Sequence, residues 1–266
     1  MNVHELEDAL FSRFPCADAE PWDHVGLSAG DPCAQVGRVC CALDATEANV
    51  RLAAARGANV LVAHHPVYLE APAAFTPAAP DRPASAAAVY TAIGLGVGII
   101  SMHTNLDRSL EARDLLPALI GLKAVHSLER PDDAAATGLG ALCEEGEAIA
   151  LGELARRLSS AFCTEPRVWG PADAPVRRVA FLGGSLGGFG EQALAQGADA
   201  IVTGEAGYHV AQDLMLRGCH PVLLGHDRSE QPFTRILRDA VIAAGVAAAD
   251  VDILDPPRQW WTSAKG

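Results

Sequence analysis

The chain has 266 residues, of which 50% are hydrophobic, and its mean hydropathy is +0.15. This length and hydrophobicity allow a substantial core, in one large domain or two smaller lobes, and they exclude a disordered protein. The formal net charge is −13. Because Lys and Arg form no cluster, the composition disfavours binding to nucleic acid or to an anionic membrane, although a local basic pocket could still hold a small phosphate.

Cysteine usage and the N-terminal sequence indicate the compartment. The seven cysteines include no Cys-x-x-Cys pair and no framework spacing, so we interpret them as reduced, mostly buried thiols of a cytosolic protein. Residues 1–14 form an acidic amphipathic pattern without the basic and apolar regions of a signal peptide. No segment reaches transmembrane length without Gly, Pro or polar interruptions. We therefore expect a soluble cytoplasmic protein without a membrane partner.

Helical and strand patterns alternate along the first half of the chain, which is typical of an α/β fold. Helices are expected over 4–14, 46–56, 85–95 and 108–122, and strands over 38–43, 59–63 and 97–102. The segments between them at 15–37 and 71–83 are rich in Pro, Gly or Ala and predict loops.

The pattern of the first half starts again near residue 178. RVCCALD at 38 corresponds to RVAFLGG at 178, and ARGANVLVA at 55 to AQGADAIVT at 195, so both pairs are 140 residues apart. Because the order of elements also repeats, we expect two α/β lobes, over about 1–125 with part of the C-terminal segment, and over about 126–230. The remaining expected elements are turns and short strands over 131–147, helices over 151–162 and 231–244, and strands over 220–224 and 251–254.

Two adjacent histidines, His64 and His65, end the apolar strand GANVLVA. Ligands of α/β sheets bind beyond the carboxyl ends of strands, and neutral imidazoles suit a transition metal. Because successive side chains of an extended chain diverge, we expect the two histidines to serve two different ions. The alternative is one buried structural histidine and one surface histidine.

The third strand of each repeat ends in a histidine followed four residues later by an acid: His103 with Asp107, and His226 with Glu230. On a helical turn the members of each pair lie on one face. Alternatively, the acids cap helices, as the D-x-x-E spacing of Asp227 and Glu230 suggests. Three such strand ends at the same edge favour a metal site, and six N and O ligands suit two ions that share a bridging carboxylate and water. The chemistry implied is hydrolysis, with an uncommitted histidine to move protons.

A glycine-rich segment, FLGGSLGGFG at 181–190, follows one strand of the second repeat. It can cradle an anion or form a tight turn, but it matches neither a P-loop nor a dinucleotide fingerprint. Glu205 stands at the repeat position of His65, and is either an acid that supports a ligand or an ordinary surface residue. Ser185, Cys40 and Cys41 have no base in a recognised motif, which disfavours nucleophilic catalysis.

Six segments together carry a family resemblance: ALDAT, GANVLVAHHP, HTNLD, VAFLGGS, GADAIVTGE and GHDRSE. In this order they resemble the NGG-interacting-factor-three-like family, which includes GTP cyclohydrolase 1 type 2 homologues. The likeness extends from WDHVGL at 22 to the final helix. It implies a fold of two intertwined α/β repeats with mixed sheets, a dinuclear metal centre in a cleft between them, and a toroidal homohexamer.

Carried over by position, the resemblance implies five metal ligands, with Glu230 well placed to bridge and with His103 beside the metals. These ligands are His64, His65, Asp107, His226 and Glu230. They would hold two divalent ions, and mixed N and O ligation is compatible with Zn, Fe, Mn, Co or Ni.

Two departures from the family pattern stand near these ligands. Gly-His-Asp227-Arg-Ser229-Glu replaces a Gly-His-Tyr-x-Thr-Glu motif and adds charge. Trp-Asp-His24 replaces Trp-Asp-Asn, which alters the pocket or supplies another ligand.

Two functions follow from the sequence. The first is a metal-dependent hydrolase that attacks a small molecule, either an imidazole ring carbon of a purine nucleotide such as GTP or another amidine or phosphoester, with His103 as the proton shuttle. The second is a metal-binding regulatory or assembly protein, whose ring presents surfaces to partners and whose ions are structural or are being trafficked. A catalytic centre keeps an exchangeable water, whereas a structural one is coordinatively closed.

Overall fold

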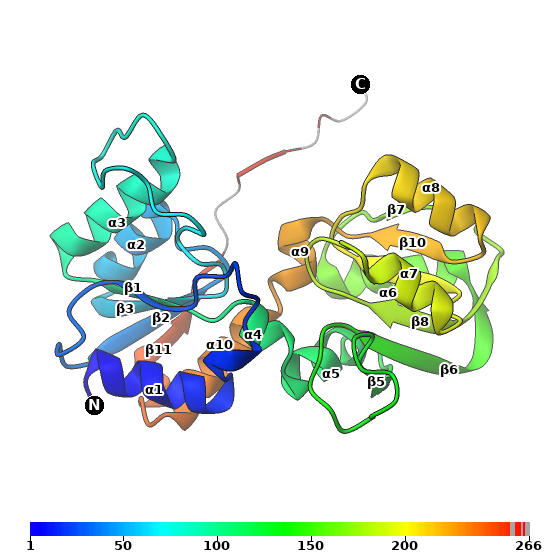
Figure 1. The fold of residues 1–266 in the computed structure, drawn as a ribbon, viewed down its shortest axis with the longest axis horizontal. Coiled ribbons are helices and arrows are strands. Elements are labelled where there is room, and N and C mark those ends of the chain that lie inside the picture. The colour runs from blue at the N-terminus through cyan, green and yellow to red at the C-terminus, as the bar shows by residue number, and fades with distance from the viewer. Residues whose placement is uncertain (256–258, 262, 264–266) are drawn as a thin grey trace. The chain divides into compact units, whose positions relative to one another are not determined.

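The protein divides into two compact units in a computed structural model that describes residues 1–255, 259–261 and 263 (Figure 1). The first unit comprises Met1–Asn105 and Thr234–Gly266, and the second comprises Leu106–Phe233. The first boundary therefore falls at Asn105, earlier than the expected position near 125. The reason is that helix α5 (Leu110–Ala118) packs against two strands of the second unit, β5 (Ala124–His126) and β6 (Ala141–Ala150).

The first unit contains a five-stranded mixed sheet with the strand order β1-β4-β3-β2-β11. Strands β2, β3 and β4 are parallel, β11 is parallel to β2, and β1 is antiparallel to β4. Helices α2 and α3 pack against each other and against this sheet, and α1 and α10 lie on its other side (Figure 1). The elements of this unit are α1 (Val3–Arg13), a 3-10 turn (Cys16–Asp18), β1 (Gly26–Ala29), β2 (Arg38–Ala42), α2 (Glu47–Ala55), β3 (Ala58–Ala63), α3 (Pro83–Leu95), β4 (Gly98–Ser101), a second 3-10 turn (Ala248–Asp250) and β11 (Val251–Ile253).

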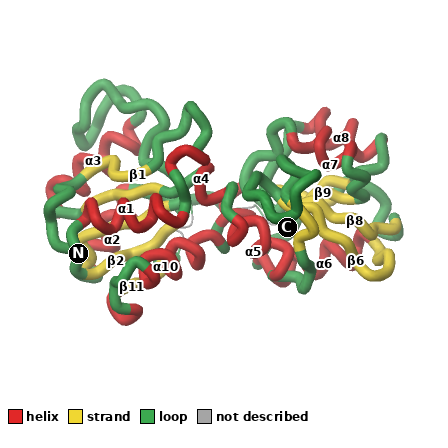
Figure 2. Tube along the Cα trace, turned by 60° about the horizontal axis from the view of Figure 1, so that its bottom comes forward, coloured by secondary structure: helices red, strands yellow, loops and turns green. Residues whose placement is uncertain are grey.

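The second unit contains a six-stranded mixed sheet with the strand order β5-β6-β8-β9-β10-β7. Here β8, β9 and β10 are parallel, and helices α7 and α8 pack against each other. In Figure 2 the strands of each unit lie between helices. Besides α5, β5 and β6, the elements of this unit are α6 (Leu151–Phe162), β7 (Arg167–Val168), β8 (Pro175–Phe181), α7 (Phe189–Ala195), β9 (Ala200–Thr203), α8 (Tyr208–Leu216), β10 (His220–Leu223) and α9 (His226–Glu230). The unit boundaries fall within α4 (Thr104–Asp107) and α10 (Phe233–Ala243).

The strand ladders confirm the internal repeat at residue level. Val39 of β2 pairs with Val60 of β3, and Val179 of β8 pairs with Ala200 of β9, so both partners are shifted by the same 140 residues. Each three-stranded parallel core also has an antiparallel neighbour on its third strand, β1 beside β4 and β7 beside β10. The predicted fold class, two α/β repeats with mixed sheets, is therefore confirmed.

Local sequence signals explain most element boundaries. The Thr46 hydroxyl accepts a hydrogen bond from the Asn49 N–H and begins α2, as expected for an N-cap. Pro83 occupies the first turn of α3, where its missing N–H costs nothing.

The expected helix over 108–122 instead begins at Leu110, because the Ser109 side chain caps it. Turns and short strands were expected over 131–147, but residues from Ala141 form one ten-residue strand, β6. Its middle, EEGE, is polar, and no residue from Glu144 onward is buried, so the strand lacks the alternation that identifies it.

Buried apolar side chains form a separate core in each unit. In the first unit they come from helices α2 and α3 and from the sheet, for example Val50, Leu61 and Ala88. In the second they include Ala180, Ile201 and Leu214. Within the described residues, no helix has the length and apolar character needed to cross a membrane.

Candidate functional site

His64 and His65 lie in a bend directly after β3, which ends at Ala63. Their backbone N–H groups donate to the carbonyls of Ala42 (3.1 Å) and Leu43 (2.8 Å), so the ladder to the chain after β2 continues through the bend. His64 is completely buried and His65 is partly exposed. The bend matters because it releases the two side chains from the alternation of an extended strand.

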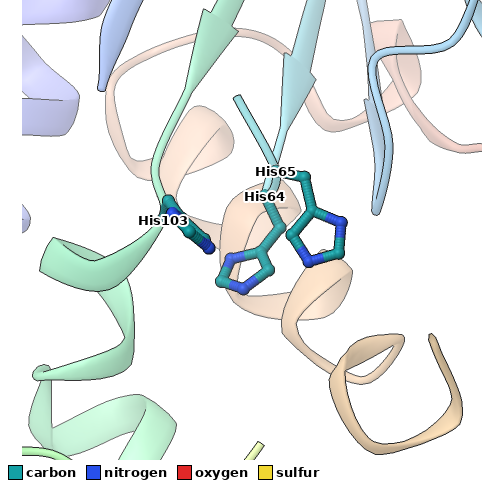
Figure 3. A group of neighbouring side chains, drawn as sticks. All are labelled: His64, His65 and His103. Atoms are coloured by element: carbon teal, nitrogen blue, oxygen red, sulfur yellow. The ribbon is translucent and has the colours of Figure 1, made fainter. Parts of the chain in front are cut away.

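Three imidazoles gather at this edge of the first sheet: His64 and His65 after β3, and His103 after β4 (Figure 3). Their ring centroids are 5.1, 5.3 and 5.6 Å apart. The expected divergence of His64 and His65 therefore does not occur, because the strand has already ended. One ligand atom from each residue lies within 4.8 Å of the other two.

These separations come close to those of a metal site. If three nitrogen atoms are at most 4.8 Å apart, an ion placed at their centre lies no more than about 2.8 Å from each of them. A Zn–N bond measures about 2.0–2.1 Å. An inward shift of at most about 0.7 Å per side chain would let the three nitrogens bind one ion. The three imidazoles of the first unit are therefore a candidate cation site.

The Nδ1 atom of each of these three histidines contacts an oxygen acceptor. His64 Nδ1 donates to the Met102 carbonyl at 3.0 Å, and His65 Nδ1 donates to Asp44 Oδ1 at 2.8 Å. A carbonyl can only accept, so the Nδ1 atom of His64 carries the proton. Metal-ligating histidines show the same arrangement, which leaves Nε2 as the ligating atom.

Asp23 holds the third histidine, His103. Its Oδ1 atom lies 2.9 Å from His103 Nδ1, and its Oδ2 atom accepts from the N–H and hydroxyl of Thr104. Burial alone would raise the pKa of the Asp23 carboxyl, but hydrogen bonds from His103 and Thr104 outweigh it and lower the pKa to about 2. Asp23 is therefore an ionised, side-chain-buried carboxylate whose partner is an imidazole N–H.

The second unit carries an imidazole and carboxylate pair on helix α9. His226 Nε2 and Glu230 Oε2, one helical turn apart, are separated by 3.1 Å. Two ligands at about 2.1 Å from a metal and about 90° apart are separated by about 3.0 Å, so this spacing fits adjacent ligands of one ion. The other nitrogen, Nδ1 of His226, lies 3.0 Å from Glu205 Oε1. Glu205 thus supports His226, one of the two roles expected for it.

The glycine-rich segment after β8 provides the space in which Glu230 lies. A Cβ at Gly184 would come within 2.2 Å of Glu230 Oε1, and a Cβ at Gly204 would come within 2.8 Å of His226 Cα. The Gly184 N–H donates to the Ser229 hydroxyl. The glycines therefore allow α9 to approach the loop closely, which supports the tight-turn interpretation over an anion cradle.

Helix capping does not account for the two acids. In the described part of α9, the N-cap is Gly225 with no side-chain cap, and Glu230 is the last helical residue. Asp107 ends α4 in a half-buried position, and the following helix is capped by Ser109. The structure brings His64, His65 and His103 together in the first unit, and His226 with Glu230 in the second. It leaves the metal contact expected of Asp107 as a prediction.

Aromatic residues surround the histidines of the first unit. Trp22 is 56% exposed, and its ring packs edge-to-face with His103 at 6.0 Å. His24, which departs from the family pattern, packs against Tyr68 at 4.6 Å. Among the described residues, His24 is therefore a packing residue and does not join the histidine group.

The four buried cysteines are not activated nucleophiles. Cys40 and Cys41 are buried on β2, and burial raises the pKa of both thiols. Burial also raises the pKa of Cys143 and of Cys219 to about 12. All seven cysteines are free thiols, as the spacing predicted.

Two acids that hold histidines were missed from the sequence. Asp44 follows β2, the neighbour of β3, so the rule applied to the histidines at strand ends also identifies it. Asp23 lies in the long loop before β1, 80 residues from His103, and no local pattern indicates that contact.

A two-unit α/β protein with histidines at the carboxyl ends of parallel strands defines a class of candidate metal-binding proteins. The chain belongs to the Duf34/NIF3 (NGG1p interacting factor 3) family, whose model matches residues 1–254. A GTP cyclohydrolase 1 type 2 homolog from Streptomyces coelicolor is 31% identical over 244 residues, covering 88% of this chain and 84% of its own. One from Clostridium acetobutylicum is 27% identical over 235 residues, covering 87% and 86%.

Solved structures share the whole fold. A Bacillus cereus protein related to NIF3 has a TM-score of 0.86 at 23% identity, with 99% of each chain covered. A Staphylococcus aureus hypothetical protein gives the same TM-score, identity and coverage. At this identity the likeness establishes the fold alone.

Proposed function

We propose that this protein is a metal-dependent hydrolase of the GTP cyclohydrolase 1 type 2 kind, which binds two divalent transition-metal ions and acts on a purine nucleotide or a related small molecule. The observation that carries the proposal is the gathering of three imidazoles at one sheet edge, each with its Nδ1 atom held by an acceptor. The proposed ligands are His64, His65, Asp107, His226 and Glu230. The family membership supports the same assignment.

The donor set fits such ions. Neutral imidazoles and carboxylates are ligands of Zn, Fe, Mn, Co and Ni. When bound, two ions lower the pKa of water and supply hydroxide near neutral pH.

His103 is the proposed proton shuttle. Its Nδ1–H donates to the ionised Asp23, so Nε2 is the ring atom that accepts a proton. Asp23 would stabilise the imidazolium that forms, because a carboxylate beside an imidazole favours its charged form. The exposed Trp22 ring beside His103 suits stacking against a planar base.

The test compares two histidine variants of the metal-loaded protein with GTP and a panel of other nucleotides. His103→Ala should abolish turnover while both ions are retained. His4→Ala, an exposed histidine of the same unit, should leave turnover unchanged. Loss of an ion from the His103→Ala variant would reassign His103 as a ligand, and no turnover of any nucleotide by the wild-type protein would refute the hydrolase proposal.

The second candidate is a metal-binding assembly protein without turnover, and exposed apolar side chains favour surfaces for partners. Tyr90 and Ile93 on α3 are 51% and 63% exposed, and Tyr208 and Leu216 on α8 are 64% and 74% exposed. Such residues mark association surfaces where they gather. In both cases we propose a cytoplasmic homohexamer, which light scattering during size-exclusion chromatography would test.

A further inference from the structure

All four histidines of the two candidate clusters place Nδ1 against an oxygen acceptor. For His64, His65, His103 and His226 these acceptors are, in order, the Met102 carbonyl, Asp44, Asp23 and Glu205. In three of the four cases the acceptor is a carboxylate. The contacts are 2.8–3.0 Å long, within the normal range of N–H···O hydrogen bonds.

We propose that Asp44 and Glu205 are positioning residues of the metal centre, which fix the Nδ1–H tautomer of His65 and of His226 and so direct Nε2 to the ion. The inference rests on the proposed function for its metal, whereas the tautomer of His65 is a property of the protein without metal. Neither acid is among the ligands expected from the sequence.

Both pairs join neighbouring parallel strands, although the strands are not equivalent in the repeat, where β2 corresponds to β8 and β3 to β9. Asp44 follows β2 and contacts the histidine that follows the neighbouring strand, β3. Glu205 follows β9 and contacts the histidine that follows the neighbouring strand, β10. In each unit a strand-end acid therefore supports the histidine of the next parallel strand.

The surroundings predict which acid contributes more. The side chains of Asp44 and His65 are 25% and 21% exposed, and those of Glu205 and His226 are 54% and 42% exposed. Solvent screens the second pair more strongly. Loss of such a partner typically weakens metal binding by about 10–100-fold. We expect the loss of metal affinity to lie near the upper end of this range for Asp44 and near its lower end for Glu205.

The experiment uses full-length protein labelled with ¹⁵N only at histidine. Long-range ¹H–¹⁵N spectra of the metal-free protein at pH 8 distinguish the two ring tautomers. Wild type should show His65 protonated at Nδ1; His226 is not diagnostic in the metal-free protein, because its Nε2 atom also lies 3.1 Å from a carboxylate oxygen of Glu230. Asp44→Ala should shift His65 to a tautomer mixture, while Asp44→Asn, whose amide oxygen still accepts, should restore the Nδ1–H form.

Zn²⁺ affinity, measured against a chromophoric chelator, is the second readout. Asp44→Ala should weaken binding by about 10–100-fold, with both ions still bound at saturation. Glu205→Ala should have a smaller effect. Asp252→Asn removes the same charge from an acid of the first unit that pairs with Arg38, and it should change neither readout. Thermal unfolding of each variant verifies folding.

Two results would overturn the proposal. One is a folded Asp44→Ala protein in which His65 keeps its tautomer and Zn²⁺ binds as in wild type. The other is loss of a whole ion in Asp44→Asn, which would make Asp44 itself a ligand. Failure of the wild-type protein to bind Zn²⁺ would instead refute the proposed metal centre, and the tautomer spectra would still decide whether Asp44 positions His65.

Discussion

Alanine at Gly184 should remove Glu230 from the position in which it can bind a metal. A Cβ at this residue would lie 2.2 Å from Glu230 Oε1, whereas ordinary contact begins at 3.4 Å. The carboxylate must therefore retreat by about 1.2 Å, more than half of a metal–oxygen bond of about 2.1 Å. Since Glu230 is buried, the movement also disturbs its 3.1 Å spacing to His226. We expect Zn²⁺ binding to weaken at least about 100-fold.

The same loop offers a matched control. Gly184 and Gly187 both have left-handed backbone angles, with φ of +61° and +50°, so alanine strains either site by about 1–2 kcal/mol. A Cβ at Gly187 meets nothing within 4 Å. Gly187→Ala should therefore lose stability but keep its Zn²⁺ affinity. A chelator-competition titration of both variants isolates the effect on Glu230, and equal affinities would refute the role assigned to the glycine.

Three further predictions concern single residues. Asp23→Asn should lower the free energy of unfolding of the metal-free protein by about 2 kcal/mol at pH 7, because the pKa of Asp23 falls from 3.8 to about 2 in the folded state. This stabilisation is present above pH 4 and lost as the pH falls towards 2. In urea unfolding, the difference in unfolding free energy between Asp23→Asn and wild type should therefore be smaller at pH 3 than at pH 7. An equal difference at the two pH values would contradict this prediction. Thr46→Ala should cost about 1 kcal/mol in the same assay through loss of the N-cap, whereas Thr76→Ala, at an exposed loop position, should cost almost nothing. His226→Ala should weaken at least one ion by more than about 100-fold in a Zn²⁺ titration, and binding as tight as wild type would remove His226 from the ligand set.

Patterns over consecutive residues predicted most of the fold. The apolar run before His64 gave β3, and the capping residue Thr46 gave the start of α2. The shift of 140 residues predicted the ladder of the second sheet, because strands of the same pattern pair in the same register. Strand β6 was missed, since its middle is polar and no residue from Glu144 onward is buried, so that the strand does not alternate.

The candidate site was predictable as far as strand ends determine it. His65, His103 and His226 each follow a parallel strand, so their positions come from the order of elements. The arrangement of the rings was not predictable, because it depends on where β3 stops and on the bend after it. The contact between Asp23 and His103 joins a loop to a strand end 80 residues away, and only the folded chain brings the two together.

Metal content tests the central claim most directly. Protein purified without added metal, reconstituted with Zn, Mn or Fe(II) and freed of excess ions, should contain two ions per chain by elemental analysis. The Gly184→Ala protein, treated identically, should contain fewer. A folded wild-type protein that retains no ion after reconstitution with any of the three metals would contradict the metal centre proposed for these histidines.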